Sequence, residues 1–275
     1  MKKIKFSGII IQIFLFILAI ITLFPLLYIF LISIGKNVIS SSTFLPENFT
    51  FENYRRLFTE THFLNWLGNS FLISGVSMFF TLVLVSVSVY VFSRLKFYGK
   101  EKLFTFILLI QVFPLTLSMV SIFRIFVELD LLNKAFGLII IDSTLASAGL
   151  IMLAKGYFDT IPYELDEAAM MDGASRLQTL VKITLPLAKP MLAIVAIQSF
   201  VIAYNEYTIA SAVMTTGIES MPLAVGLQSM ITGQFGINWS LYCAGAVIGS
   251  IPMLFLFYTL QRYFISGLTE GGVKQ

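Results

Sequence analysis

Between two long apolar runs the chain reads Glu167-Ala168-Ala169-Met170-Met171-Asp172-Gly173-Ala174. Pro162 precedes this stretch and suits a first helical turn, because its missing N–H would have no helical partner there. Acidic side chains, Glu164 among them, follow closely and would lie at the positive end of the helix dipole. Gly173 then offers a stop that can turn without a Cβ penalty. The stretch therefore predicts a short helix that ends at this glycine.

A second amphipathic segment begins at Ser175, and we expect Pro186 to end it. Its apolar positions are Leu177, Leu180, Val181 and Ile183. Two short helices that meet at a glycine, with small alanines on one face, would form a compact knob. Such a knob can sit deep in a groove of another protein. An amphipathic hairpin lying on the membrane surface is the alternative that the residues alone leave open.

The composition of the chain is that of a membrane protein. Of its 275 residues, 57% are hydrophobic and 12% are charged, whereas a soluble domain carries about 25% charged residues. One cysteine, Cys243, and one histidine, His62, exclude a disulfide framework and argue against a metal site. No G-x-x-x-x-G-K-[ST] loop occurs, so we expect neither ATP hydrolysis nor a catalytic residue or cofactor in this chain. The net charge of +3 gives no argument for nucleic acid.

Six apolar runs are long enough to cross a bilayer as helices. They cover about 9–34, 70–93, 103–127, 138–157, 191–214 and 241–263, so that residues 1–275 would form a single all-α transmembrane domain. In this arrangement only five of the 18 lysines and arginines lie on one side of the membrane: Lys36, Arg55, Arg56, Arg124 and Lys134. The positive-inside rule then predicts that both termini and the loop 158–190 are cytoplasmic, in a multi-pass protein of the cell membrane.

Polar residues interrupt the fifth predicted span at Tyr204, Asn205, Glu206 and Tyr207. An ionisable group in hydrocarbon costs about 2.5–3.5 kcal/mol on insertion scales, so such groups usually face a bundle interior or a water-filled path. One interpretation places these residues in a translocation path or its gate. The other makes them a buried polar clamp between helices, and the residues alone favour neither. We expect Asp142, near the outer end of the fourth span, to be interfacial.

The knob motif is similar to the coupling loop of permease subunits of binding-protein-dependent ABC importers. The resemblance includes the later Ile183-Thr184-Leu185-Pro186 and Pro190, then Asn205-Glu206-Tyr207 and the tail Gly267-Leu268-Thr269-Glu270-Gly271-Gly272-Val273-Lys274. The chain looks most like the smaller, MalG-type subunit of maltose/maltodextrin importers. The resemblance implies the type I importer permease fold, with a cytoplasmic helix-turn-helix coupling loop that contacts an ATPase through Glu164, Glu167, Ala168, Ala169, Asp172, Gly173, Ala174, Leu185 and Pro186.

The tail is expected to contact the same ATPase through Gly267, Thr269, Gly271 and Gly272. With three glycines and no apolar stripe, the tail from Ser266 is not expected to form a stable helix alone. Its order would have to come from a partner.

The resemblance also implies the partners. They are a second, MalF-like permease subunit, a dimeric cytosolic ATPase that binds ATP and Mg, and an extracytoplasmic sugar-binding protein, which the segment 215–239 would touch. The expected function is then carbohydrate import, with a maltodextrin-like oligosaccharide as solute. Alternatives are the same machine with another solute, such as glycerol phosphate or an acidic oligosaccharide, or a proton-driven secondary carrier with Glu206 as its proton site.

Overall fold

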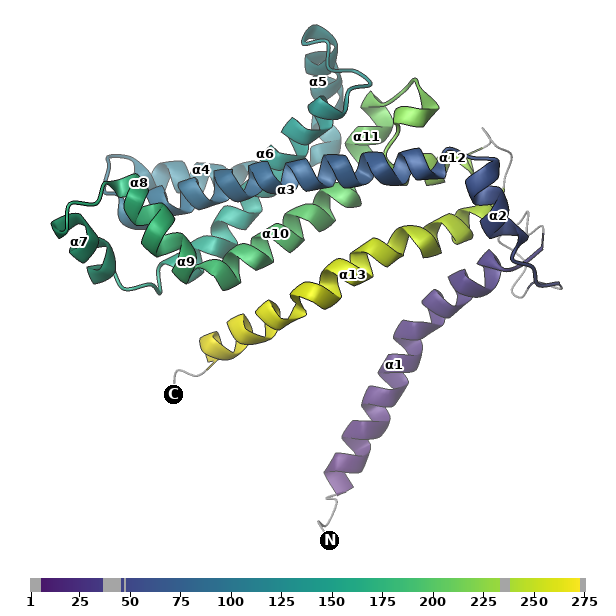
Figure 1. The fold of residues 1–275 in the computed structure, drawn as a ribbon, viewed down its shortest axis with the longest axis horizontal. Coiled ribbons are helices and arrows are strands. Elements are labelled where there is room, and N and C mark those ends of the chain that lie inside the picture. The colour runs from purple at the N-terminus through teal and green to yellow at the C-terminus, as the bar shows by residue number, and fades with distance from the viewer. Residues whose placement is uncertain (1–5, 37–45, 47, 233–237, 273–275) are drawn as a thin grey trace. The chain divides into compact units, whose positions relative to one another are not determined.

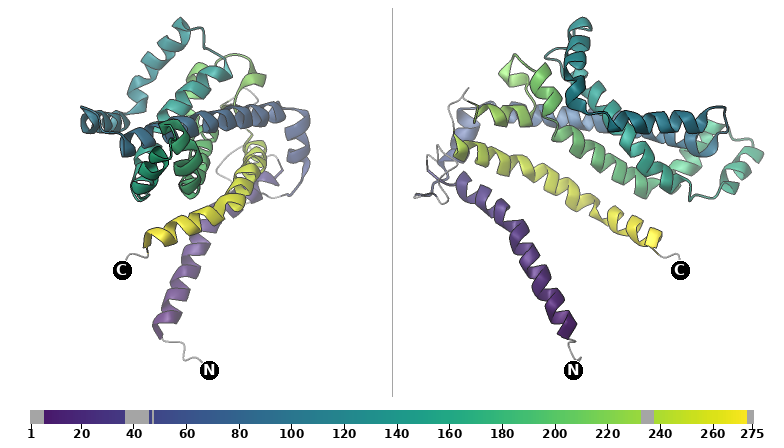
Figure 2. Two further views of the ribbon diagram at one scale, coloured as in Figure 1. Left: turned by 60° about the vertical axis from the view of Figure 1, so that its left-hand side comes forward. Right: turned by 180° about the vertical axis from the view of Figure 1, so that it is seen from behind.

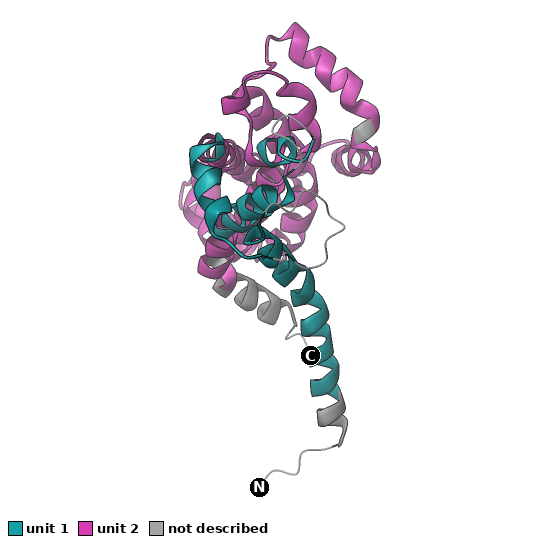
Figure 3. Cartoon of the chain, turned by 90° about the vertical axis from the view of Figure 1, so that its right-hand side faces the viewer, with its two compact units in different colours: residues 1–63, 226–251 teal, residues 64–225, 252–275 magenta. Residues whose placement is uncertain are grey.

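The computed structural model describes residues 6–36, 46, 48–232 and 238–272. Within these ranges the chain is helical and contains no strand, and a single isolated bridge pairs Gly35 with Phe49. The predicted all-α fold is therefore confirmed. The chain divides into two compact units, which Figure 3 colours separately: residues 1–63 with 226–251, and residues 64–225 with 252–275.

The first unit is built from α1 (Phe6–Ser33), α2 (Glu52–Thr59) and the N-terminal part of α13 (Trp239–Gly272), labelled in Figure 1. Asn53 ties α2 to the end of α1, because its Nδ2 donates to the carbonyl oxygens of Ser33 and Gly35, at 2.8 Å each. The last carbonyls of a helix have no partner inside the helix, so a side-chain donor satisfies them. In the same unit, Ile32 and Cys243 are buried together in a small apolar cluster.

The second unit holds most of the remaining helices. They are nearly all of α3 (Phe63–Arg94), then α4 (Lys100–Val112), α5 (Leu115–Glu128), α6 (Ala135–Phe158), α7 (Glu164–Met171), α8 (Arg176–Thr179), α9 (Leu185–Leu187), α10 (Lys189–Tyr204) and α11 (Thr208–Val213). A π-helical turn (Leu180–Thr184), a 3-10 turn (Ile218–Ser220) and the start of α12 (Leu223–Ser229) complete it. Helices α6 and α10 pack against each other (Figure 1, Figure 2).

Small hydroxyl residues hold α3 against α6. Ser143 Oγ donates to the backbone carbonyl of Ser77 at 3.3 Å, and Thr81 Oγ1 donates to the carbonyl of Ser143 at 3.5 Å. Such small polar residues let two membrane helices approach closely. The apolar core of this unit lies beside these contacts, with Val89, Ala154 and Val195 fully buried.

Within the described residues, five helical segments are long and apolar enough to cross a membrane: α1, α3, α6, α10 with α11, and α13. The pair α4 and α5 makes a sixth if it counts as one span, but the two helices are bent by 102° to each other. The span predicted at 103–127 is therefore broken in two, with Pro114 at the break. The break follows from Pro114, which disfavours helical geometry at the residue before it, and Phe113 is indeed extended, with φ −71° and ψ 126°.

The end of the chain also differs from the prediction. Helix α13 continues to Gly272, although we did not expect the tail from Ser266 to be helical without a partner. A glycine-rich segment cannot easily start a helix, but extending an existing helix avoids the cost of a new nucleus. The last predicted span, 241–263, is thus part of a longer helix, and residues 273–275 lie outside the described part.

Candidate functional site

The predicted knob is formed by α7, a tight turn and α8, at one end of the second unit (Figure 1). Gly173 has φ +85°, in the left-handed region that the sequence suggested. The N–H of Gly173 donates to the carbonyl of Met170 at 3.1 Å, and the N–H of Ala174 donates to that of Ala169 at 3.0 Å. These two bonds form a Schellman motif, which satisfies the last carbonyls of α7 and stops the helix.

Helix α8 begins with a capping box at Ser175. The backbone N–H of Gln178 donates to Ser175 Oγ at 3.3 Å, while the N–H of Ser175 donates to Gln178 Oε1 at 2.8 Å. Two N–H groups that a helix start leaves without partners are satisfied in this way. The turn between α7 and α8 is therefore fixed by hydrogen bonds on both sides.

The prediction that Pro186 ends the second segment is wrong. The chain passes through the π-helical turn into α9, which contains Pro186, and continues into α10 at Lys189. Proline is tolerated there because it stands in the first turn of α9, where a missing N–H breaks no necessary bond. Leu185, beside it, is half-buried, whereas Pro186 is exposed.

The knob has an inner and an outer face, which the sequence motif does not separate. Ala169 is buried against the rest of the unit, and Ala174 is half-buried. The exposed members of the motif are Glu164, Glu167, Ala168, Asp172 and Gly173. Large apolar side chains are exposed among them, with Met171 at 87% and Leu177 at 68%. The outer face therefore combines carboxylates, small residues and uncovered apolar groups.

A buried ion pair that sequence reasoning missed fixes the inner face. Arg94 is the last residue of α3, and its Nε lies 2.5 Å from Oδ2 of Asp166 in α7. The two side chains are only 6% and 3% exposed. Thr184 Oγ1 donates to Asp166 Oδ1 at 3.0 Å, and Arg94 Nη2 donates to the carbonyl of Ile161 at 2.8 Å. The guanidinium also lies 5.8 Å from the ring centroid of Tyr163. These contacts tie the knob to the end of a long apolar helix.

The polar residues of the fifth span occupy a helix break, which we had not predicted. Helix α10 ends at Tyr204 and α11 starts at Thr208, so Asn205, Glu206 and Tyr207 are non-helical. The carboxylate of Glu206 accepts hydrogen bonds from the backbone N–H groups of Ile209 and Ala210, at 2.7 and 2.8 Å. Glu206 therefore caps the start of α11.

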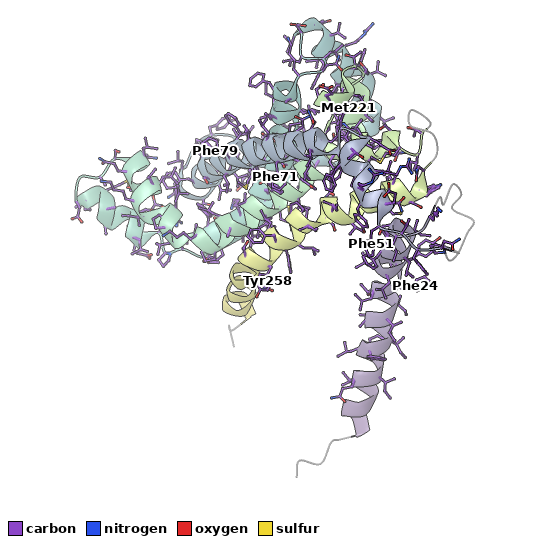
Figure 4. The ribbon with its side chains drawn as sticks, turned by 45° about the vertical axis from the view of Figure 1, so that its right-hand side comes forward. Phe24, Phe51, Phe71, Phe79, Met221 and Tyr258 are labelled. Atoms are coloured by element: carbon purple, nitrogen blue, oxygen red, sulfur yellow. The ribbon has the colours of Figure 1, made fainter. Side chains whose placement is uncertain are left out.

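The four candidate path residues do not converge on one point. Asn205 Nδ2 donates back to the carbonyl of Val201 at 3.0 Å, and Tyr207 is exposed. Tyr204 is buried and belongs to an aromatic cluster, stacked on Phe200 with ring centroids 5.7 Å apart. Phe71 of α3, labelled in Figure 4, meets Tyr204 edge-on at 6.0 Å. Glu206 lines a cavity of this unit, whose described lining does not include the other three.

Asp142, which we expected to be interfacial, is buried within the protein. It is 3% exposed in α6, lines the same cavity as Glu206, and has an oxygen, Oδ1, without a hydrogen-bond partner among the described residues. The tail candidates Gly267, Thr269, Gly271 and Gly272 lie in the last turns of α13, and their side-chain surroundings are outside the described part.

Comparison with known proteins agrees with these features. A family described as "Binding-protein-dependent transport system inner membrane component" matches residues 71–270. The maltodextrin transport system permease protein MdxG of Bacillus subtilis (strain 168) is 35% identical over 267 residues, covering 95% of this chain and 94% of the relative. The galactooligosaccharides transport system permease protein GanQ of the same organism is 36% identical over 265 residues, covering 94% and 92%.

Similarity extends to a solved structure. A chain from a bacterial ABC transporter involved in the import of the acidic polysaccharide alginate superposes with a TM-score of 0.80 at 27% sequence identity, covering 96% of this chain and 98% of that one. The family resemblance inferred from the knob motif is confirmed, and with it a helical membrane permease fold. The chain belongs to the inner membrane components of binding-protein-dependent transport systems.

Proposed function

We propose that this chain is a permease subunit of an ABC importer for a carbohydrate. Relatives named for maltodextrin and galactooligosaccharide transport, each matched over more than nine tenths of its length, support a carbohydrate as the solute. The subunit works with a second, MalF-like permease, a dimeric ATPase that binds ATP and Mg, and an extracytoplasmic sugar-binding protein. It forms one transmembrane domain, and its termini and the knob lie on the cytoplasmic side of the cell membrane.

One observation carries the proposal: the inner face of the knob is held by buried polar contacts, while its outer face is uncovered. Met171 and Leu177 expose apolar surface on a loop that the positive-inside rule puts in the cytoplasm. Exposed apolar groups of this kind, rimmed by polar ones, are typical of a protein–protein interface. A groove on the ATPase would cover them, while Glu164 and Glu167 would pair with basic groups at its rim.

The Arg94–Asp166 pair gives the docked knob a mechanical connection to the membrane. When ATP closes the ATPase dimer, a displacement of α7 is passed through this buried contact to the end of α3. Removing one partner of a buried ion pair costs about 3–5 kcal/mol, so the contact resists breaking during such a movement. The cavity between the permease subunits then opens outward to receive the sugar. The end of α13, with Gly267, Thr269, Gly271 and Gly272, makes a second contact with the ATPase.

Tyr204, Asn205, Glu206 and Tyr207 contribute to the translocation path or its gate. The break between α10 and α11 places non-helical backbone inside an otherwise apolar span, which membrane proteins tolerate where it is buried in protein or lines a cavity. A proton-driven carrier is less well supported. Both carboxylate oxygens of Glu206 already accept backbone hydrogen bonds, which ties this side chain to α11 instead of leaving it free to relay a proton.

Reconstitution tests the proposal. The chain is placed in proteoliposomes with its partner permease and ATPase, and uptake is measured for a labelled oligosaccharide that titration shows to bind the cognate external protein. We expect uptake to require both ATP and the binding protein. Uptake driven by a proton gradient in vesicles that contain no ATPase would contradict the proposal.

A further inference from the structure

A polar cavity of about 540 Å³ lies in the first unit, between the end of α1 and the start of α2. Its polar lining consists of Lys36, Asn48, Thr50, Glu52, Asn53 and Arg56. None of these residues belongs to the knob or to the interrupted spans of the second unit. The proposed function therefore gives this α1–α2 cavity no role.

The α1–α2 cavity lies at the depth where α1 leaves the membrane. The apolar segment Ile11–Ser33 has 23 residues, which make a helix of about 34 Å across a hydrocarbon layer of about 30 Å. Its last turn therefore reaches the edge of that layer. Just beyond it, the N–H of Thr50 donates to the carbonyl of Ile34 at 2.6 Å, and the N–H of Lys36 donates to that of Asn48 at 2.9 Å. These backbone bonds hold the cavity at the level of the lipid headgroups.

Cationic groups of the lining are available to an anion. Lys36 forms no ion pair with another described residue. Arg56 donates to Glu60 through Nε at 2.8 Å, and its two Nη groups have no hydrogen-bond partner among the described residues. The acidic lining residue, Glu52, is already compensated, because its Oε1 accepts from Nε of Arg55 at 2.8 Å.

A hydroxyl group adds a neutral donor to these cations. Thr50 Oγ1 accepts the backbone N–H of Glu52 at 3.1 Å, so the hydroxyl proton of Thr50 is left to donate. Lys, Arg and hydroxyl donors around one space are the groups that bind phosphate oxygens. The lining of the α1–α2 cavity therefore suits a phosphate group.

Aromatic side chains are exposed beside this polar lining. Phe49, whose backbone pairs with Gly35 in the isolated bridge, is 61% exposed, and Phe51, labelled in Figure 4, is 74% exposed. Aromatic rings at the end of a membrane span are typical of the interface between headgroups and acyl chains. Basic side chains at the same depth extend their charged ends to the headgroups. One phospholipid molecule can satisfy both kinds of surface.

The depth of the α1–α2 cavity favours a lipid over a protein partner. The external binding protein approaches from the water, whereas the backbone bonds to Ile34 and Lys36 keep Phe49 and Thr50 within a few residues of the apolar span. A free anion in water would fit the cations but would leave both phenylalanine rings uncovered.

We propose that the α1–α2 cavity binds the phosphate group of an anionic phospholipid in the outer leaflet. Lys36, Arg56 and the Thr50 hydroxyl contact the phosphate, while Phe49 and Phe51 lie against the upper part of the acyl chains. This assigns a lipid ligand to the permease, in addition to the solute and the ATPase. It fixes the depth of α1 on the side of the membrane where the positive-inside rule puts Lys36 and Arg56.

The test measures contact between this site and lipids of known headgroup. The complete transporter, with partner chains free of cysteine, carries a bimane fluorophore on Phe51→Cys in the Cys243→Ser background. It is reconstituted into phosphatidylcholine vesicles with an equal mole fraction of spin-labelled phosphatidylglycerol or spin-labelled phosphatidylcholine, each labelled high on the acyl chain. The ratio of quenching by the two lipids gives the headgroup preference. Lys36→Gln is the test variant, and Lys134→Gln, at an exposed lysine paired with Asp130, is the matched control.

We expect the unsubstituted site to be quenched about fivefold more by phosphatidylglycerol, the preference that one basic residue near a membrane surface provides. Lys36→Gln should remove most of this preference, while Lys36→Arg and Lys134→Gln should keep it. Phe49→Ser should reduce quenching by both lipids. The preference should also fall as the salt concentration rises.

Equal quenching by the two lipids, or an unchanged preference in Lys36→Gln, would overturn the lipid site. Loss of the preference on adding inorganic phosphate would show that the cavity takes a free anion. Loss of quenching on adding saturating external binding protein would make this surface a protein interface, which also contradicts the proposal. Failure of the proposed function is separate, because it appears as absent ATP-dependent uptake, whereas the quenching needs neither ATP nor sugar.

Discussion

Arg94 and Asp166 form a buried ion pair that joins the last residue of α3 to the inner face of α7, with Nε and Oδ2 2.5 Å apart. Thr184 completes the arrangement by donating to the other carboxylate oxygen of Asp166. The pair thus connects three separate segments: the end of an apolar span, the knob, and the π-helical turn that leads into α10. The side chain of Asp166 therefore links the knob directly to the end of α3 and to the π-helical turn.

Removing Asp166 should release the knob. Asp166→Ala leaves the Arg94 guanidinium buried without its counter-charge, which costs about 3–5 kcal/mol. We expect a lower thermal unfolding midpoint in detergent and ATP hydrolysis that no longer drives uptake. Arg94→Met combined with Asp166→Leu should recover part of the unfolding midpoint, because no charge is then left buried.

The Lys155–Asp159 pair supplies the control for this experiment, because it is much less buried: its side chains are 25% and 44% exposed, and Nζ lies 2.5 Å from Oδ2. Asp159→Ala should change the unfolding midpoint little, since exposed ion pairs contribute about 0–1 kcal/mol. Equal effects of Asp166→Ala and Asp159→Ala would show that burial of the Arg94 pair has no mechanical importance.

Gly173 should tolerate only residues that accept a left-handed backbone. A Cβ at this position would meet no described atom within 4 Å, so the penalty comes from the φ of +85° and not from a clash. Gly173→Val should weaken ATPase co-purification and uptake, since left-handed geometry costs about 1–2 kcal/mol for an ordinary residue. Gly173→Asn should behave nearly as the wild type, because Asn visits that region readily.

Gly156→Ala provides the comparison for Gly173, since a Cβ there also meets no described atom within 4 Å and α6 has ordinary helical geometry. This variant should keep full activity. If Gly173→Val also kept full ATPase binding and uptake, the turn geometry would not matter for coupling.

Substitutions of Ala168 should affect ATPase binding without affecting the folding of this chain. It is exposed on the outer face of α7, whereas Ala169 beside it is buried. Ala168→Trp should therefore leave the chain inserted and folded but remove the ATPase by steric clash in its groove. Ala168→Ser should co-purify with the ATPase as the wild type does. Normal ATPase binding by Ala168→Trp, measured in the same pull-down, would place the interface elsewhere.

Glu206 should affect transport through the start of α11. Glu206→Ala removes the acceptor of two backbone N–H groups, and losing a helix cap costs about 0.5–2 kcal/mol. We expect a loss of uptake larger than any loss of assembled complex. Asn205→Ala removes only one exposed bond to Val201 and should have the smaller effect on stability. Normal uptake by both variants, with reduced stability, would favour a structural clamp over the path.

The sequence predicted what depends on local patterns. The apolar runs located the spans, and Gly173 with Ser175 marked the turn of the knob, because backbone conformation and helix caps are decided by neighbouring residues. The bend of 102° at Pro114 was not predicted, since a proline shows where a helix can break but not by how much.

Long-range pairs were beyond a reading of the sequence alone. Arg94 belongs to a cluster of basic residues that the positive-inside rule already explains, and Asp166 is typical of a helix start. Neither residue therefore indicated in the sequence that it has a buried ion-pair partner. The burial of Asp142 was not predicted either, because its position in the span does not show which face of α6 it occupies. The break at 205–207 carries no proline or glycine and therefore gave no local signal.

Labelling of single cysteines tests the central claim, that the outer face of the knob is cytoplasmic and docks the ATPase. Cys243 is the one native cysteine, so Cys243→Ser gives a background without cysteine. Met171→Cys is the test variant in this background, and Tyr98→Cys is its control. The native side chains at these two positions are 87% and 99% exposed. An impermeant maleimide should label both from the cytoplasmic side, and bound ATPase should block labelling at residue 171 only. Equal labelling at residue 171 with and without the ATPase, or labelling from the outside, would contradict the account.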